Sequence, residues 1–180
     1  IFKSLPPLDG ISFFKFTRTL TNSDNLKKIC RQKNGLYFLK NRGNFLKIRE
    51  KRTKIAQIKW RLLKKKVKFL RLAPFLRLAA INGSLAIYNT NPNSDFDLLI
   101  VAARNRLWLS RIFTTALTGI LGIRRHGSQV KDRLCLNCYI DEQNLNMEVE
   151  SRLYRFQSVQ EYSRLTLIIE LKSGLYQKFL

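Results

Sequence analysis

The chain has 180 residues, and 45% of them are hydrophobic, so it is long and apolar enough to bury the core of one domain, or of a domain with a small companion. Its 34 Lys and Arg against 12 Asp and Glu give a formal net charge of +22. This charge indicates a polyanionic partner, most simply RNA or DNA, although cations spread over solvated faces would give the same composition. The charge is uneven, because residues 1–79 hold 22 of the basic residues and three acids.

The longest apolar stretch, Leu107–Ile123, contains one arginine, three threonines and two glycines, so we expect no transmembrane helix and no membrane partner.

The cysteines are Cys30, Cys135 and Cys138, an odd number without a signal peptide, which is typical of the reducing cytoplasm. On a single strand, the spacing of Cys135 and Cys138 would place the two thiols on opposite faces, so we expect no shared zinc site. The chain begins with Ile1 instead of Met, from which we expect a piece of a longer protein.

The chain is predicted to divide into a basic N-terminal segment at 1–73 and a second domain at 74–180. In the first segment, Ser23 is a suitable cap for a short helix that runs to Gln32. The Asn34-Gly35 dipeptide then marks a stop or a turn.

Two short apolar runs, 36–39 and 45–48, flank a loop that contains glycine, and this pattern predicts a β-hairpin. A helix followed by a hairpin with a basic tip resembles a winged helix, in which Arg42 would lie on the wing and touch a phosphate backbone. The simpler alternative is a structural hairpin that packs against the next helix.

A long basic helix is predicted over Lys54–Leu72, because apolar residues recur there at helical spacing and Pro74 ends the pattern. The apolar positions are Ile55, Ile58, Leu62, Leu63, Val67 and Leu70. The rest of the helix surface is expected to carry Lys59, Lys64, Lys65, Lys66 and Lys68. Most such runs are solvated faces, and a surface that faces phosphates is the alternative.

The segment from 74 to 180 alternates between strand and helix patterns, which predicts an α/β domain. Buried strands are expected at 75–82, 95–102 and 134–140. Helices are expected at 85–88, 107–123 and 148–170.

The most informative pattern is Gly83-Ser84 at a strand end, followed after ten residues by Asp95 and Asp97 in an apolar run. Carboxylates one residue apart on a strand point to the same face, and they repel each other unless a cation lies between them. A Gly-Ser that opens a helix offers backbone N–H groups and a hydroxyl to a phosphate. Together they are the minimum equipment for metal-assisted phosphoryl or nucleotidyl transfer. A turn-capping role would explain Asp95, but not Asp97 inside the strand.

This Gly-Ser-x10-Asp-x-Asp pattern resembles the nucleotidyltransferase superfamily, which includes polymerase-beta-like enzymes and minimal nucleotidyltransferases, over roughly residues 75–140. The resemblance implies a small mixed β-sheet flanked by helices. It also implies that Asp95 and Asp97 are catalytic residues that hold Mg²⁺ or Mn²⁺, and that Gly83 and Ser84 bind the β- and γ-phosphates of an NTP such as ATP. The implied reaction moves a nucleoside monophosphate to a hydroxyl group on RNA, DNA, a protein or a small molecule.

The superfamily usually has a third carboxylate on a later strand, and this sequence has Asn137 where that residue is expected. The acids close by in the sequence are Asp132, Asp141 and Glu148. If none of them replaces the third ligand, the alternative function is a non-catalytic module that binds a nucleotide or a nucleic acid with an incomplete metal site. An antitoxin-like role, as in minimal nucleotidyltransferases, is a third alternative.

Overall fold

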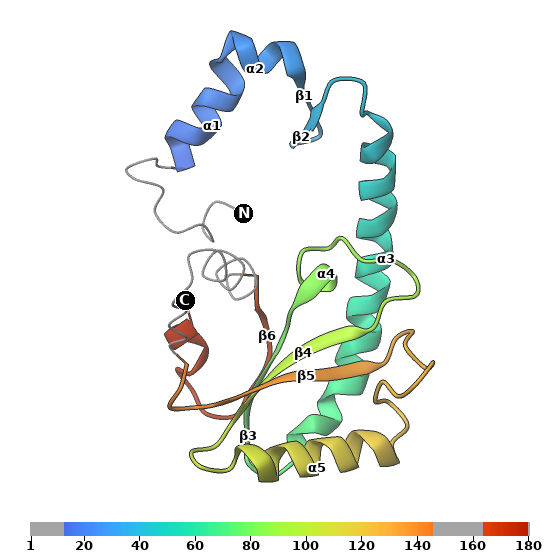
Figure 1. The fold of residues 1–180 in the computed structure, drawn as a ribbon, viewed down its shortest axis with the longest axis vertical. Helices are drawn as coiled ribbons and strands as arrows, with labels where there is room; N and C mark the ends of the chain where they lie inside the picture. Colours follow the sequence, from blue (N-terminus) through green and yellow to red (C-terminus); the bar gives the residue numbers. More distant parts are fainter. Residues whose placement is uncertain (1–12, 146–163, 180) are drawn as a thin grey trace.

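A computed structural model describes residues 13–145 and 164–179, and its centre is a four-stranded mixed β-sheet in the order β5-β4-β3-β6 (Figure 1). The strands are β3 (Leu76–Ile81), β4 (Phe96–Ala102), β5 (Leu134–Asp141) and β6 (Thr166–Glu170). β3 is antiparallel to both β4 and β6, whereas β4 and β5 are parallel. The expected α/β architecture with a mixed sheet and flanking helices is therefore confirmed.

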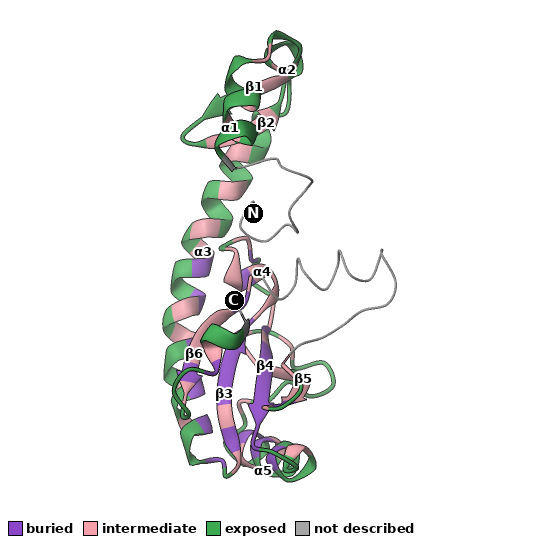
Figure 2. Ribbon diagram, turned by 90° about the vertical axis from the view of Figure 1, so that its left-hand side faces the viewer, coloured by how far each residue is buried: buried purple, intermediate pink, exposed green. Residues whose placement is uncertain are grey.

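Two helices cover one face of this sheet, namely α3 (Asn44–Val67), which continues as the 3-10 helix η2 (Lys68–Leu72), and α5 (Leu107–Ile120). Alternate residues of β4 divide between the faces: Leu98 and Ile100 pack with these helices, and Leu99 and Val101 belong to a second cluster on the other face. Figure 2 shows the resulting buried band in β3, β4 and the adjoining side of α3. Within the described residues, no helix combines the length and the apolar character that crossing a membrane requires.

The N-terminal part of α3 extends beyond the sheet and carries a small arm at its end (Figure 1). The arm consists of α1 (Phe13–Asn22), α2 (Asp24–Ile29), β1 (Cys30–Lys33) and β2 (Leu36–Leu39). β1 and β2 form a separate two-stranded antiparallel sheet.

The hairpin of this arm is displaced from the predicted one, which paired 36–39 with 45–48. Asn34 and Gly35 form its turn with φ values of 51° and 73°, and an Asn-Gly pair with positive φ is what a two-residue hairpin turn favours. The helix predicted to reach Gln32 is wrong beyond Ile29, because the following residues form β1. The basic wing expected at Arg42 is also wrong, since the tip of the hairpin is Asn34-Gly35.

Helix α3 begins at Asn44, well before the predicted start, but Leu63, Val67 and Leu70 of the predicted apolar stripe are buried as expected. Its buried residues are Ala56, Lys59, Leu63 and Val67, which follow one another at steps of three and four. Ile58, which was placed in the apolar stripe, is 60% exposed. The prediction that Lys59 decorates the solvated face is wrong, because the residue is only 3% exposed.

The C-terminal part of the chain contributes a fourth strand that the sequence pattern did not predict. The helix expected over Glu148–Glu170 is wrong at its end, because Thr166–Glu170 forms β6 and pairs with β3. The part of that expectation at 148–163 lies outside the described residues. After β6, Leu175 and the short helix η3 (Tyr176–Phe179) follow, and Leu175 packs into the second core cluster.

Candidate metal- and phosphate-binding site

The site begins at the turn where β3 ends and the short helix α4 (Gly83–Ala86) starts. The Asn82 N–H donates to the Asp97 carbonyl at 2.9 Å, and the Asn82 side chain accepts from the Gly83 N–H at 2.7 Å. Ser84 follows and is partly exposed, whereas Leu85 anchors the helix in the core. The turn is therefore fixed to β4 by a backbone hydrogen bond and to the core by one apolar side chain.

Gly83 is required at this turn for two reasons. Its φ is +67°, a conformation that side chains disfavour. A Cβ atom built on it would also lie 2.8 Å from Asp97 Oδ2, closer than van der Waals contact allows. The backbone of the turn therefore touches the carboxylate that the sequence pattern assigns to the metal.

A Gly83→Ala substitution is expected to destabilise the fold by about 1–3 kcal/mol through backbone strain and to displace the Asp97 carboxylate. Gly35→Ala is the matched control, because Gly35 has a similar φ of +73° but nothing within 4 Å of the place that a methyl group would take. Urea unfolding should show destabilisation in both variants, and Mn²⁺ binding should weaken in Gly83→Ala alone. Unchanged Mn²⁺ binding in Gly83→Ala would mean that the contact with Asp97 does not shape the site.

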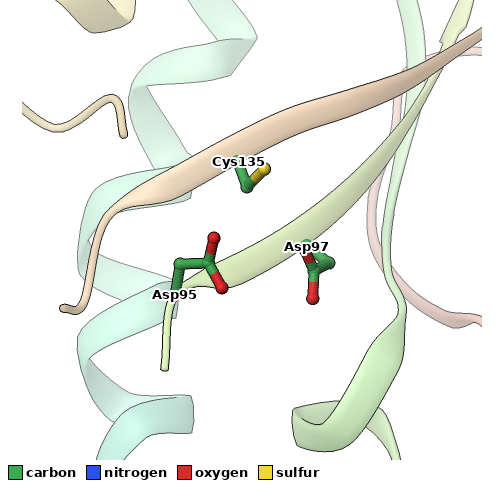
Figure 3. Close-up of side chains that lie close together, drawn as sticks. All are labelled: Asp95, Asp97 and Cys135. Atoms are coloured by element: carbon green, nitrogen blue, oxygen red, sulfur yellow. The ribbon is translucent and has the colours of Figure 1, made fainter. Parts of the chain in front are cut away.

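Two carboxylates and one thiol converge beside this turn (Figure 3). Asp95 directly precedes β4, Asp97 lies in it, and Cys135 is the register partner of Asp97 on the parallel strand β5. One ligand atom from each of the three side chains lies within 4.8 Å of the other two. A single cation can therefore contact all three groups, and the two carboxylates supply the oxygen ligands that Mg²⁺ and Mn²⁺ prefer.

The charges at the site are partly balanced by Arg125, whose Nη1 donates to Asp95 Oδ2 at 2.7 Å. The hydrogen bond to Asp95 raises the pKa of Arg125 above its ordinary value. Burial, followed by the negative charges of Asp95 and Asp97, raises the pKa of the Cys135 thiol, and Arg125 opposes this effect. The raised pKa favours the protonated thiol at Cys135, and the guanidinium of Arg125 forms its ion pair with Asp95.

Asn137 lies close to the site but is not the strand partner of either acid. Its Nδ2 donates to Asp97 Oδ1 at 3.4 Å. The pairing of β4 with β5 shifts between Leu98 and Leu99, whose partners are Leu136 and Cys138, so Asn137 is the extra residue at this irregularity.

The same irregularity changes where the two β5 cysteines lie. Cys138 is the partner of Leu99 and packs against the second core cluster, on the face that Asp97 shares with Leu99. Cys135 approaches Asp97 on that face as well. The expectation of opposite faces for the two cysteines is therefore wrong, although Cys138 is not part of the candidate metal group.

The acids considered as a replacement third ligand lie elsewhere. Asp132 pairs with Lys59, and Asp141 accepts backbone N–H groups of Asn105 and Gln143 at the opposite end of β5. Glu148 is outside the described residues. In the part of the chain that is described, Cys135 is the one His, Cys, Asp or Glu side chain that joins Asp95 and Asp97 in a potential metal site.

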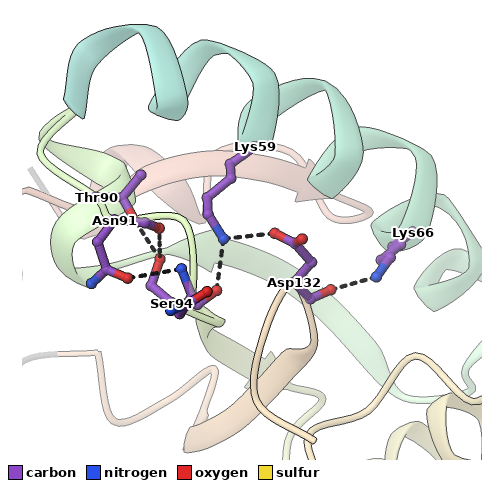
Figure 4. Close-up of polar contacts among 7 residues, drawn as sticks. Lys59, Lys66, Thr90, Asn91, Ser94 and Asp132 are labelled. Atoms are coloured by element: carbon purple, nitrogen blue, oxygen red, sulfur yellow. Dashed lines mark hydrogen bonds and ion pairs between the residues drawn. The ribbon is translucent and has the colours of Figure 1, made fainter. Parts of the chain in front are cut away.

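Lys59 of α3 holds the loops next to the site in place, a role that the sequence pattern did not predict (Figure 4). Its Nζ donates to the Ser94 carbonyl at 2.7 Å and to Asp132 Oδ1 at 2.6 Å. Lys66, about two turns further along α3, donates to the Asp132 carbonyl. These contacts fix the loops that lead into Asp95 and into β5. The available indication was the position of Lys59 between Ala56 and Leu63 at the spacing of a buried helix face.

No protein-family model, curated protein or solved structure matches this chain. Its function is therefore inferred from the arrangement of Gly83, Asp95, Asp97 and Cys135. The sequence pattern contained the first three, and the fold adds the fourth.

Proposed function

We propose that this chain is a metal-dependent nucleotidyltransferase that moves a nucleoside monophosphate from an NTP to a hydroxyl acceptor. The observation that carries the proposal is the contact between the Gly83 turn and the Asp97 carboxylate, where a Cβ would approach Oδ2 to 2.8 Å. A metal-bound triphosphate presents phosphate oxygens and a cation side by side. A binding site for it needs backbone donors beside carboxylates, and the Gly83 turn lies beside Asp97.

The side chains divide between these two tasks. Asp95 and Asp97 would hold Mg²⁺ or Mn²⁺, which neutralises the phosphates and polarises the reacting phosphorus. The Gly83 N–H, which donates to the Asn82 amide oxygen in this structure, is suited to an oxygen acceptor such as a β- or γ-phosphate. The Ser84 hydroxyl would provide a second donor at the same turn. Arg125 can move from Asp95 to the phosphates when a cation takes its place.

One observation favours a second candidate, a non-catalytic module that binds a nucleotide through an incomplete metal site. Among the described residues, the group next to Asp95 and Asp97 is a thiol and not a third carboxylate. A thiol is a poor ligand for Mg²⁺, so a second magnesium ion, which would activate the acceptor hydroxyl, has a weak position here. The Asn137 amide oxygen is a weaker substitute.

The test is transfer of α-labelled nucleotide from each NTP, with Mg²⁺ or Mn²⁺, to total RNA and to the protein itself. The Asp95→Ala/Asp97→Ala double variant provides the matched control. We expect a labelled product that this variant does not form, and its identity would reveal the acceptor class. Absence of label together with intact metal-dependent NTP binding would favour the binding module. Absence of both would exclude the two candidates.

A further inference from the structure

The outward surface of α3 and η2 carries a regular row of cations. Six exposed residues form it, and we call them the α3 cation row: Lys47, Lys51, Lys54, Arg61, Lys65 and Lys68. Steps of three, four and seven residues separate them, so they lie along one line of the helix. The row is opposite the buried face, because residues two positions apart on a helix, such as Arg61 and Leu63, are separated by about 200°.

Among the described residues, no carboxylate forms an ion pair with this row. α3 and η2 contain 12 Lys and Arg but one acid, Glu50. In the described parts of the chain, Lys59 is the one cation of α3 and η2 that forms an ion pair with a carboxylate. Arg49 and Lys66, which lie off the row, donate to backbone carbonyls and so support the fold. Among the described residues, no hydrogen bond or ion pair gives the six cations of the row a comparable role in supporting the fold.

We propose that the α3 cation row binds the phosphate backbone of a nucleic acid. From Lys47 to Lys68 the row extends about 32 Å, at 1.5 Å per helical residue. One strand of a duplex carries a phosphate about every 3.4 Å along its axis, so the row spans about nine phosphates. The arm at the end of α3 enlarges the basic surface, because residues 13–43 contain eight Lys and Arg and one acid. A continuous polyanion satisfies all of these charges together.

An anionic membrane is a less suitable partner for the same row. A helix that lies in a membrane interface needs a broad apolar face beside its cations. Between Lys47 and Lys68, the exposed large hydrophobic side chains are Ile48 and Ile58, which do not make a broad apolar face. The α3 cation row is also separate from the proposed catalytic site, since α3 covers the sheet face opposite to the one that Asp97 shares with Leu99.

The test compares two variants of the full chain that lose the same charge. K51Q/K54Q/K65Q/K68Q removes four members of the row, and R104Q/R124Q/K131Q/K178Q removes four exposed cations outside α3 and the arm. All eight positions are exposed, so both variants should keep the far-ultraviolet circular dichroism and the melting temperature of the wild type.

Fluorescence anisotropy measures the binding of single-stranded and duplex RNA and DNA, long enough to span the row, as a function of salt concentration. We expect the row variant to bind more weakly and to lose about 3 units of the log K against log salt slope for single strands, or about 4 for duplexes. The control variant should stay close to the wild type, and the four oligonucleotides identify the preferred nucleic acid.

Three results would overturn the proposal. Equal losses in both variants would show that net charge alone governs binding. No detectable binding of any oligonucleotide by the wild type would remove the partner. If the wild type bound phosphatidylserine vesicles but no nucleic acid, and only the row variant lost the vesicle binding, the row would be assigned to a membrane surface.

Discussion

Replacing Lys59 with methionine is expected to lower the free energy of unfolding by about 3 kcal/mol, because it leaves the Asp132 carboxylate without its cation. The Lys59 side chain is 4% exposed, and its ammonium group donates to Asp132 Oδ1 at 2.6 Å and to the Ser94 carbonyl at 2.7 Å. Methionine keeps the length of the apolar stem, so the change removes the charge without opening a large cavity. Urea unfolding monitored by circular dichroism measures the difference.

The control for this variant is Lys64→Met on the exposed surface of the same helix, which should change stability by less than about 0.5 kcal/mol. A Lys59→Met/Asp132→Asn double variant should recover part of the loss, because no unpaired charge remains. Asparagine suits this position, since Asp132 has a φ of 57°, which Asn tolerates. If Lys59→Met and Lys64→Met are equally stable, Lys59 does not hold the two loops in place.

An Asp97→Asn substitution is expected to weaken Mn²⁺-dependent nucleotide binding and any nucleotidyl transfer by about two orders of magnitude, equivalent to about 3 kcal/mol. Asn has nearly the shape of Asp, so the close contact with the Gly83 turn remains while one anionic ligand is lost. Asp95 alone, held by Arg125 at 2.7 Å, is a weak cation site. Electron paramagnetic resonance of free Mn²⁺ and the labelled transfer assay measure the two effects.

Asp24→Asn serves as the control, because Asp24 is an exposed carboxylate on α2 that pairs with Lys27 and lies outside the site. It removes the same charge and should leave both measurements unchanged. Wild-type Mn²⁺ binding in Asp97→Asn would contradict the assignment of the metal to this cluster, and lost binding in both variants would indicate a non-specific charge effect.

Much of the sheet and of the candidate site follows from local sequence alone. The apolar runs that become β3 and β4 are continuous, because these two strands are largely buried. The run that becomes β5 is interrupted by Asn137 and is only partly buried, and the α5 pattern is long enough to be unambiguous. Asp95 and Asp97 share a face because side chains alternate along an extended chain. Gly83 was also assigned from the sequence, since a turn that brings the backbone close to another group leaves no space for a Cβ.

Other features depend on contacts between distant segments, which no local pattern contains. β6 exists because β3 offers it a free edge, and a helical pattern in isolation does not reveal that pairing. Lys59 is buried because two loops, at Ser94 and Asp132, bring acceptors to its ammonium group, whereas composition alone places lysine on the surface.

The third member of the site most clearly separates what local sequence predicts from what tertiary contacts decide. The sequence indicated Asn137 for that position, but the register of β5 against β4 brings Cys135 opposite Asp97 and leaves Asn137 as the extra residue at the irregularity. Strand register is determined by which pairing buries the apolar face of each strand, and here that includes the clusters on both faces of the sheet. The sequence by itself therefore determined the two acids and the glycine turn, and the tertiary structure decided which side chain completes the group.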